Sequence, residues 1–278
     1  MSAVRLVLLS DLHVGVHCDL DQVRALERWI PEAAPTAIVL AGDLTQRARH
    51  GEFQRALAFV ELLRRTAPVL VIPGNHDVQW WTSPLHLFGA RRLHAKYRQY
   101  FGDLTPTVEA PGALLVGTLS AHGIAPGSMT WNLRDLAVKG HLPAAETDRA
   151  TRVFAAADPA LVRVVALHHN VLRGEISRRM GLAHWRSAQE RLAASGADLV
   201  LCGHDHQESV GQLAGGAVVV AASTHSNRTR GRHPTVFQVI EADRTAITVR
   251  PQRWVAAEGR FDAAGEHRFA RWRPLTVD

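Results

Sequence analysis

The chain is poor in cysteine and has no long apolar run. Its 278 residues include only Cys18 and Cys202, which are far apart and lack the C-x-x-C spacing of zinc ribbons. A disulfide framework is therefore excluded, and we expect a reducing compartment, the cytoplasm. No apolar run approaches the ~20 residues of a membrane-spanning helix. We therefore expect no membrane span.

Lysine is also scarce. Of the 32 basic residues only Lys96 and Lys139 are lysines, and 26 acidic residues leave a formal net charge of +6. A basic excess can indicate nucleic-acid binding, but these arginines are scattered along the sequence. Nucleic acid therefore stays an open but not a favoured partner. With 46% hydrophobic residues the chain can bury a sizeable core, so disordered and repeat classes are excluded.

Apolar runs of strand length alternate with segments of helical periodicity. Continuous apolar runs are typical of strands buried on both faces, and their alternation with helices indicates an α/β fold. From Val218 onward the pattern becomes antiparallel, with a hairpin joining 235–241 to 247–250. No linker or repeat interrupts the chain, so we expect one domain over 1–278. The predicted strands are 5–10, 37–41, 69–73, 113–119, 163–167, 198–202 and 217–222, and the helices are 20–33, 53–65, 147–156 and 185–194.

Five predicted strands end in residue types that bind metals. The carboxyl ends of strands in an open α/β sheet share one crevice, so clusters distant in sequence can meet there. In extended backbone, residues i and i+2 project to the same side, so D-x-H and H-x-H can each form a pincer. Asp, Asn and His without thiolate suit Mn, Fe or Zn. The clusters are Asp11-Leu12-His13, Gly42-Asp43, Gly74-Asn75-His76-Asp77, His168-His169 and Gly203-His204-Asp205-His206.

In this order the clusters resemble the calcineurin-like metallophosphoesterases, a family of two-metal phosphatases, phosphodiesterases and nucleases. The resemblance implies a four-layer α/β/β/α sandwich, in which two mixed β-sheets pack face to face with helices outside. It also implies two divalent metal ions and attack on phosphorus by a metal-bridging hydroxide. The implied ligands are Asp11, His13, Asp43 and His206 for the first metal, and Asp43, Asn75, His168 and His204 for the second. His76 matches the family's histidine that protonates the leaving oxygen.

Other residues near the clusters have less specific roles. Asp77 is expected to orient His76 or a ligand, or to cap a turn. Substrate choice is expected to depend on loops at about 78–105, 122–142 and 223–233. The family commonly has proline where this chain has Asn170, a departure that concerns loop geometry. Candidate substrate contacts, each with a purely structural alternative, are Trp80, Trp81, His169, His225, Arg228 and Arg230.

Length and motif order are similar to the class III cyclic nucleotide phosphodiesterases within the family. We therefore expect a phosphodiesterase acting on a small diester, with 3′,5′-cyclic AMP as the leading candidate. The alternatives are a nuclease or DNA-repair enzyme, a phosphomonoesterase, and a scaffold without catalysis. The aromatic residues between arginines in 253–273 are expected to pack across the core or against a second subunit, so a homodimer is possible.

Overall fold

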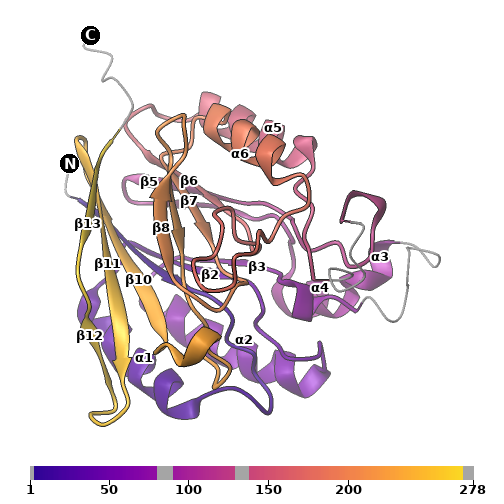
Figure 1. Ribbon diagram of the computed structural model, residues 1–278, viewed down its shortest axis with the longest axis vertical. Helices are drawn as coiled ribbons and strands as arrows, with labels where there is room; N and C mark the ends of the chain where they lie inside the picture. Colours follow the sequence, from indigo (N-terminus) through magenta and orange to yellow (C-terminus); the bar gives the residue numbers. More distant parts are fainter. Residues whose placement is uncertain (1–2, 80–89, 129–137, 272–278) are drawn as a thin grey trace.

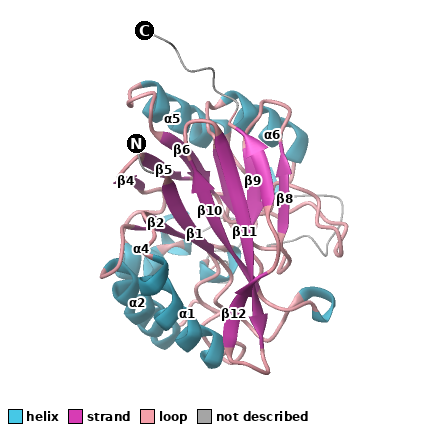
Figure 2. Cartoon of the chain, turned by 90° about the vertical axis from the view of Figure 1, so that its left-hand side faces the viewer, coloured by secondary structure: helices cyan, strands magenta, loops and turns pink. Residues whose placement is uncertain are grey.

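The computed structural model describes residues 3–79, 90–128 and 138–271. Within these residues two mixed β-sheets face each other, and helices cover their outer faces (Figures 1 and 2). The seven-stranded sheet has the order β12-β11-β10-β1-β2-β3, with β13 also pairing with β11, and the six-stranded sheet has the order β4-β5-β6-β7-β9-β8. The predicted α/β sandwich of two mixed sheets is confirmed.

The bounds of the elements are as follows. The strands are β1 Val4–Leu9, β2 Ala37–Ala41, β3 Val69–Ile72, β4 Thr107–Ala110, β5 Ala113–Gly117, β6 Val162–Ala166, β7 Leu199–Cys202, β8 Ser209–Gln212, β9 Val218–Ala221, β10 Val236–Ala242, β11 Ala246–Val255, β12 Arg260–Ala263 and β13 His267–Ala270. The helices are α1 Leu20–Ala33, α2 His50–Arg64, α3 Ala90–Leu93, α4 Ala95–Phe101, α5 Ala144–Ala155 and α6 Trp185–Ala194.

The layers follow from the two-residue period of the strands. In β1, Leu6 and Leu8 lie in the core between the sheets, together with apolar residues of β6, β7 and β9. Val7 and Leu9 point the other way and pack with residues of α1 and α2. A third core lies between the six-stranded sheet and helices α5 and α6. Because both faces of these strands are covered, their sequences are continuously apolar.

Long helices matched the sequence prediction better than short elements. The bounds of α1 and α6 are those predicted, whereas α2 begins at His50, where the Glu52 carboxylate accepts hydrogen bonds from the backbone N–H of Arg47 and Arg49. The prediction of a loop over 78–105 was wrong for residues 90–101. This part forms α3 and α4, because Tyr97 is fully buried and packs with Phe53 of α2.

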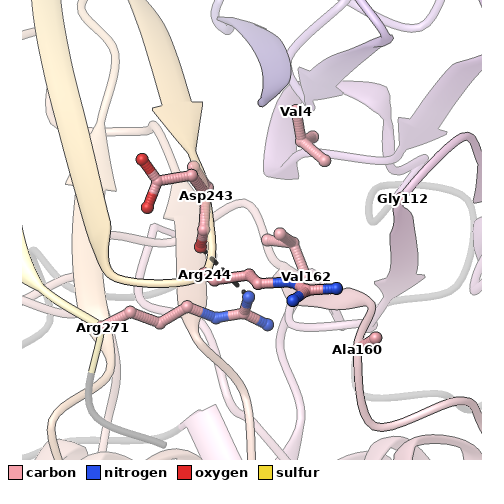
Figure 3. A pocket seen from close by; sticks show the side chains of 8 residues that line it. Val4, Gly112, Ala160, Val162, Asp243, Arg244 and Arg271 are labelled. Carbon is pink, nitrogen blue, oxygen red and sulfur yellow. Dashed lines mark hydrogen bonds between the residues drawn. The ribbon is translucent and has the colours of Figure 1, made fainter. Parts of the chain in front are cut away.

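Three of the C-terminal aromatic residues, Trp254, Phe261 and Phe269, pack on the core of their own chain, and Trp272 lies outside the described residues. Phe261 lies edge-to-face with Phe237, with ring centroids 4.9 Å apart, and Trp254 packs against Phe261. Beyond β13, the buried side chain of Arg271 donates hydrogen bonds to the Asp198 carboxylate and to the carbonyl of Leu161. Leu161 directly precedes β6 and Asp198 directly precedes β7, both in the other sheet. Figure 3 shows Arg271 reaching the Asp243 carbonyl beside a cavity of about 20 Å³. Such a cavity holds about one water.

A candidate dinuclear metal centre

The predicted ligands meet at one edge of the sandwich. They follow the carboxyl ends of β1, β2 and β3 in the first sheet and of β6 and β7 in the second. Each set of strands is parallel within its sheet, so these ends lie on the same side. The structure thus brings together side chains up to 195 positions apart in sequence, as expected for a crevice outside the carboxyl ends.

A first cluster consists of Asp11, His13 and His206. The two histidine Nε2 atoms lie 2.9 Å apart, and Asp11 Oδ1 lies 3.7 Å from His13 Nε2 and 3.4 Å from His206 Nε2. Asp11 Oδ2 accepts hydrogen bonds from the Ser10 hydroxyl and the His204 backbone N–H, whereas Oδ1 is buried without a hydrogen-bond partner. An unpartnered buried carboxylate oxygen beside two imidazole nitrogens fits a metal ion.

A second cluster consists of Asn75, His168 and His204. Asn75 Oδ1 lies 3.1 Å from His168 Nε2 and 3.0 Å from His204 Nδ1, and these two nitrogens are 3.2 Å apart. His168 Nδ1 donates a hydrogen bond to the carbonyl of Ala41 at 2.7 Å. That hydrogen bond fixes the tautomer and leaves the Nε2 lone pair available to a metal.

Asp43 lies between the two clusters and is 1% exposed. Its Oδ2 is 3.8 Å from His13 Nε2 in the first cluster, and its Oδ1 is 3.4 Å from His168 Nε2 in the second. The backbone N–H of His76 donates to Oδ1 at 2.8 Å and fixes the carboxylate. One oxygen therefore faces each cluster, which is the arrangement that a bridging ligand requires.

His76 borders the first cluster without belonging to it. Its ring lies edge-to-face with that of His13, with centroids 4.7 Å apart. Its Nδ1 donates a hydrogen bond to the carbonyl of Gln46 at 2.8 Å. Nε2 is therefore the nitrogen available to a bound molecule.

Five of the seven predicted ligands occupy left-handed backbone conformations. Among the described residues, five of the nine non-glycine residues with positive φ are predicted ligands: Asp11, His13, Asp43, His204 and His206, with φ between 46° and 77°. The expectation that the D-x-H and H-x-H pincers use extended backbone was therefore wrong. Each strand has already ended before these five residues, which lie in the turns that follow. Such backbone costs of order 1–3 kcal/mol per residue and is concentrated at functional sites.

Glycines allow the ligand loops to approach one another. A Cβ on Gly74 would lie 2.1 Å from Asp43 Oδ1, and a Cβ on Gly203 would lie 1.8 Å from Ser10 Oγ. Neither site has room for a side chain. The close backbone approach lets the carboxylates of Asp43 and Asp11 pack directly against neighbouring main chain.

Burial sets the protonation of the centre. Burial lowers the pKa of His13 to about 4 and that of His204 well below its usual range, so both rings are neutral and keep a free lone pair. Burial also opposes protonation of His168, but the charge and hydrogen bond of Asp43, the charge of Asp11 and the Ala41 carbonyl together outweigh burial and raise the pKa of His168 to about 9. A metal ion bound at Nε2 would therefore displace a proton from this ring. The buried carboxylates Asp11 and Asp43 thus require nearby positive charge.

Asp77 binds the backbone of the ligand loops. Its carboxylate accepts hydrogen bonds from the N–H groups of Leu44, Thr45 and Gly74 at 3.1, 2.9 and 2.9 Å. Burial, followed by the charge of Asp43, raises the pKa of Asp77 to about 6. Of its two expected roles, these contacts favour turn capping, because they join the loop after β2 to the loop after β3.

The candidate substrate contacts fall in different places. Trp80 and Trp81 lie outside the described residues. Both ring nitrogens of His169 have protein partners, Ser120 Oγ at 2.9 Å and the Val138 carbonyl at 3.1 Å. His225 is fully buried beside Phe237 and Phe261, so its side chain is not available at the surface.

The two candidate arginines lie beside His206. Arg230 donates to Asp205 Oδ1 and to the Asp205 carbonyl, both at 3.1 Å, and is engaged by these contacts. Arg228 is exposed, and its carbonyl accepts a hydrogen bond from His206 Nδ1 at 2.9 Å. The Arg228 side chain is thus available next to the first cluster.

Several residues that shape the centre were missed by the sequence reasoning. The Ser10 hydroxyl holds Asp11, and the Gln46 and Ala41 carbonyls orient His76 and His168. Ser10, directly before the ligand, could have been suspected from its position. The Gln46 and Ala41 carbonyls belong to the backbone, and any residue type at these positions would supply the same group. Their roles therefore leave no signal in the sequence.

The donor set fits two divalent ions. The first cluster offers imidazole nitrogen and carboxylate oxygen, and the second offers imidazole nitrogen and the amide oxygen of Asn75. Backbone carbonyls outside the centre fix the rings of His168 and His206. The two cysteines are free and do not contribute, since burial raises the thiol pKa of Cys18 to about 11 and that of Cys202 to about 12.

Comparison with known proteins identifies relatives of this architecture. Residues 4–208 match the family described as Calcineurin-like phosphoesterase. A Danio rerio transmembrane protein with metallophosphoesterase domain is 30% identical over 109 residues, which are 36% of this chain and 24% of the relative. The match therefore spans about a quarter of that relative. In the described part of this chain, no helix is long and apolar enough to cross a membrane.

Solved structures share the fold at low sequence identity. A dimetal phosphatase from Danio rerio has a TM-score of 0.67 and 13% identity, with 96% of this chain and 99% of that chain covered. A purple acid phosphatase from yellow lupin has a TM-score of 0.67 and 12% identity over 97% and 54%. GAP50, described as the anchor in the inner membrane complex of Plasmodium, has a TM-score of 0.62 and 13% identity over 100% and 92%.

Proposed function

The chain belongs to the calcineurin-like phosphoesterase family, and we propose that it is a phosphodiesterase that uses two divalent metal ions to hydrolyse a small phosphodiester. Family membership supports a metal-dependent phosphoester hydrolase, and the preference for diesters is the finer proposal. The observation that supports a two-metal hydrolase most directly is the position of Asp43, whose two oxygens face two separate ligand clusters. Among diesters, 3′,5′-cyclic AMP is the leading candidate, because the motif order resembles that of class III cyclic nucleotide phosphodiesterases.

The proposed ligand sets share Asp43. Asp11, His13 and His206 would complete one set, and Asn75, His168 and His204 the other. Two divalent ions held there, Mn, Fe or Zn, would supply the positive charge that binds phosphoryl oxygens and the acidity that makes a water nucleophilic. The protein orients the donors: Ser10 fixes Asp11, and the carbonyls of Ala41 and Arg228 fix the rings of His168 and His206.

His76 is the proposed general acid. Its Nδ1 is bound to the Gln46 carbonyl, so a proton on Nε2 can pass to the leaving oxygen of a substrate at the first cluster. General acid help of this kind contributes about 10²–10⁴-fold. It matters most for an alkoxide leaving group, such as the sugar oxygen released from a cyclic nucleotide.

A phosphomonoesterase is the second candidate, because two of the structural neighbours are named phosphatases. A nuclease or DNA-repair enzyme would need a basic surface long enough for a strand. A scaffold without catalysis is disfavoured by the complete donor set and His76. Cytoplasmic location is a proposal supported by the two free cysteines, and a homodimer stays a prediction.

The test is a substrate panel with the Mn²⁺-loaded protein. Cyclic nucleotides, a linear diester such as bis(p-nitrophenyl) phosphate, monoesters and single-stranded DNA would be assayed for wild type, Asn75→Ala and His76→Ala. We expect diester hydrolysis that Asn75→Ala abolishes. His76→Ala should lose more activity on a cyclic nucleotide than on the nitrophenyl ester, whose leaving group needs little protonation. Cleavage of monoesters alone would contradict the proposal.

A further inference from the structure

An arginine-rich loop follows the metal-ligand candidate His168. Residues 172–179 have the sequence Leu-Arg-Gly-Glu-Ile-Ser-Arg-Arg and are called the arginine loop here. Arg173, Arg178 and Arg179 are exposed in it. Glu175 is its only carboxylate. None of the three arginines has a carboxylate partner in the part of the chain that the structure describes.

Hydrogen bonds fix the arginine loop at its base. The Asn170 side-chain amide donates to the carbonyls of Leu172, at 2.8 Å, and Arg179, at 3.3 Å, and so joins the two ends of the loop. The Gly174 N–H also donates to the Arg179 carbonyl, at 3.0 Å. Proline, common at position 170 in the family, cannot make the side-chain contacts. The departure from the family pattern thus serves the geometry of this loop.

The tip of the arginine loop is fixed to the H-x-H segment. The Ser177 hydroxyl donates to the buried Asp205 carboxylate, and the Ile176 N–H donates to Gln207 Oε1 at 2.8 Å. Asp205 also pairs with Arg230 at 3.1 Å. One buried carboxylate therefore holds the arginine loop against the segment 223–233, beside the metal-ligand candidate His206.

Arg228 extends the positive charge of the arginine loop. It is exposed, it lies two residues from Arg230, and its carbonyl binds His206 Nδ1. The four arginines are exposed and lie on two segments that Asp205 joins. Guanidinium groups bind phosphate oxygens through paired hydrogen bonds. Because the backbone of the loop is fixed before binding, only the arginine side chains lose conformational entropy when they bind such a group.

We propose that the arginine loop, with Arg228, is a binding site for a second phosphate group of the substrate, beyond the phosphodiester that is cleaved. The proposal rests on the proposed phosphodiesterase function and narrows its substrate class. Diesters with a further phosphate, as in a nucleoside bisphosphate ester or a short nucleic-acid strand, should then be cleaved more efficiently than a diester without one, such as 3′,5′-cyclic AMP. Arg230 has a different role: it neutralises Asp205 and positions the loop.

A matched pair of substrates tests the site. One is the p-nitrophenyl ester of thymidine 5′-phosphate, and the other carries an additional 3′-phosphate. The readout is the ratio of their kcat/KM values. We expect wild type to favour the bisphosphate at least about tenfold, which corresponds to one charge-assisted contact. The variant Arg173→Gln/Arg178→Gln/Arg179→Gln should bring the ratio close to one. Arg65→Gln, an exposed arginine after α2, should keep the wild-type ratio.

Two further arms sharpen the outcome. Asn170→Ala keeps every arginine but removes the hydrogen bonds that join the two ends of the loop. The ratio of kcat/KM values should therefore fall to a value between those of wild type and the triple variant. Oligothymidylates of increasing length distinguish the two sources of the second phosphate: a gain that stops at one added phosphate indicates a small substrate, and a gain that continues indicates a strand. A wild-type ratio near one, or an unchanged ratio in the triple variant, overturns the proposal. Failure of wild type on both esters would instead count against the proposed function.

Discussion

At the scale of single residues, the centre depends on which atom of each side chain is left without a partner. One carboxylate oxygen of Asp11 accepts hydrogen bonds from Ser10 and His204, and the other has no hydrogen-bond partner. His168 donates a hydrogen bond from Nδ1 to a backbone carbonyl, which leaves Nε2 facing the centre. The sequence allowed the residue types to be predicted, because only certain side chains bind metals. The choice of atom could not be predicted for His168, because the Ala41 carbonyl, far away in sequence, determines it, and for Asp11 it depends in part on the distant His204 N–H.

The first prediction concerns His168. Replacing it with Ala removes a nitrogen donor from the second cluster and leaves the first cluster intact. Manganese bound per chain after equilibration should therefore fall from two ions toward one, as measured by elemental analysis. His267→Ala, an exposed histidine on β13, should bind two ions like wild type. Loss of both ions in both variants would contradict the assignment.

The second prediction compares two glycines. In Gly74→Ala the new Cβ would lie 2.1 Å from Asp43 Oδ1, so the ligand loop must shift. We expect a loss of about 2 kcal/mol in unfolding free energy, the usual cost of overpacking, measured by urea denaturation. Gly51→Ala in α2 meets no atom within 4 Å and should gain up to about 1 kcal/mol from helix propensity. Equal effects of the two substitutions would contradict the close-packing argument.

At the scale of elements, length and burial decided what could be predicted. The core strands and the long helices left strong apolar patterns. Strands β4 and β8 did not, because they lie at the edges of their sheet and are only partly buried. Helix α4 was missed because its pattern is short and Tyr97 finds its partners on α2. The backbone of the ligand turns also escaped prediction, because left-handed aspartate and histidine are held there by contacts between different loops.

The third prediction concerns the ion pairs across β1, β10 and β11. Glu241 accepts hydrogen bonds from Arg250 and, at 2.8 Å, from Arg5. The hydrogen bond from Arg250 lowers the pKa of Glu241 most. Burial opposes this shift, and the hydrogen bond from Arg5 adds to it. Because this pKa is lower in the folded state, the stabilisation is present above about pH 4.5 and is lost as pH falls through the folded-state value.

Glu241→Gln tests this dependence. At pH 7 the unfolding free energy of the variant should be about 0.5 kcal/mol lower than that of wild type. The difference is small because the ion pairs are partly exposed. The difference should shrink in urea denaturation at pH 3. A difference that grows toward acid pH would have the wrong sign for a carboxylate stabilised in its charged form.

At the scale of the whole molecule, the fold joins two sheets whose strand ends form one centre. The order of the motifs made this foreseeable, because five strand-end clusters in one chain require a shared crevice. The distribution of charge was not foreseeable. The arginines look scattered in the sequence, yet Asp205 joins the arginine loop to the segment of Arg228, about 50 residues further along.

The fourth prediction concerns the contact that ties the C-terminal strands to the other sheet. The Arg271 and Asp198 side chains are 6% and 2% exposed and lie 3.1 Å apart. Arg271→Ala removes two charge-assisted hydrogen bonds from the buried Asp198 carboxylate, so we expect a loss of about 3 kcal/mol in unfolding free energy. Arg268→Ala, on the exposed side of β13, should change it by less than about 0.5 kcal/mol. Urea denaturation measures both values. Similar losses of unfolding free energy in Arg271→Ala and Arg268→Ala would contradict a stabilising role of the buried Arg271–Asp198 ion pair.

The most direct test of the central claim is a crystal structure of the Mn²⁺-loaded protein with anomalous scattering data. The account predicts two manganese peaks ~3.5–4 Å apart, on either side of the Asp43 carboxylate. The peak next to Oδ2 should be bound by Asp11, His13 and His206, and the peak next to Oδ1 by Asn75, His168 and His204. A single peak, or two peaks that do not share Asp43, would contradict it.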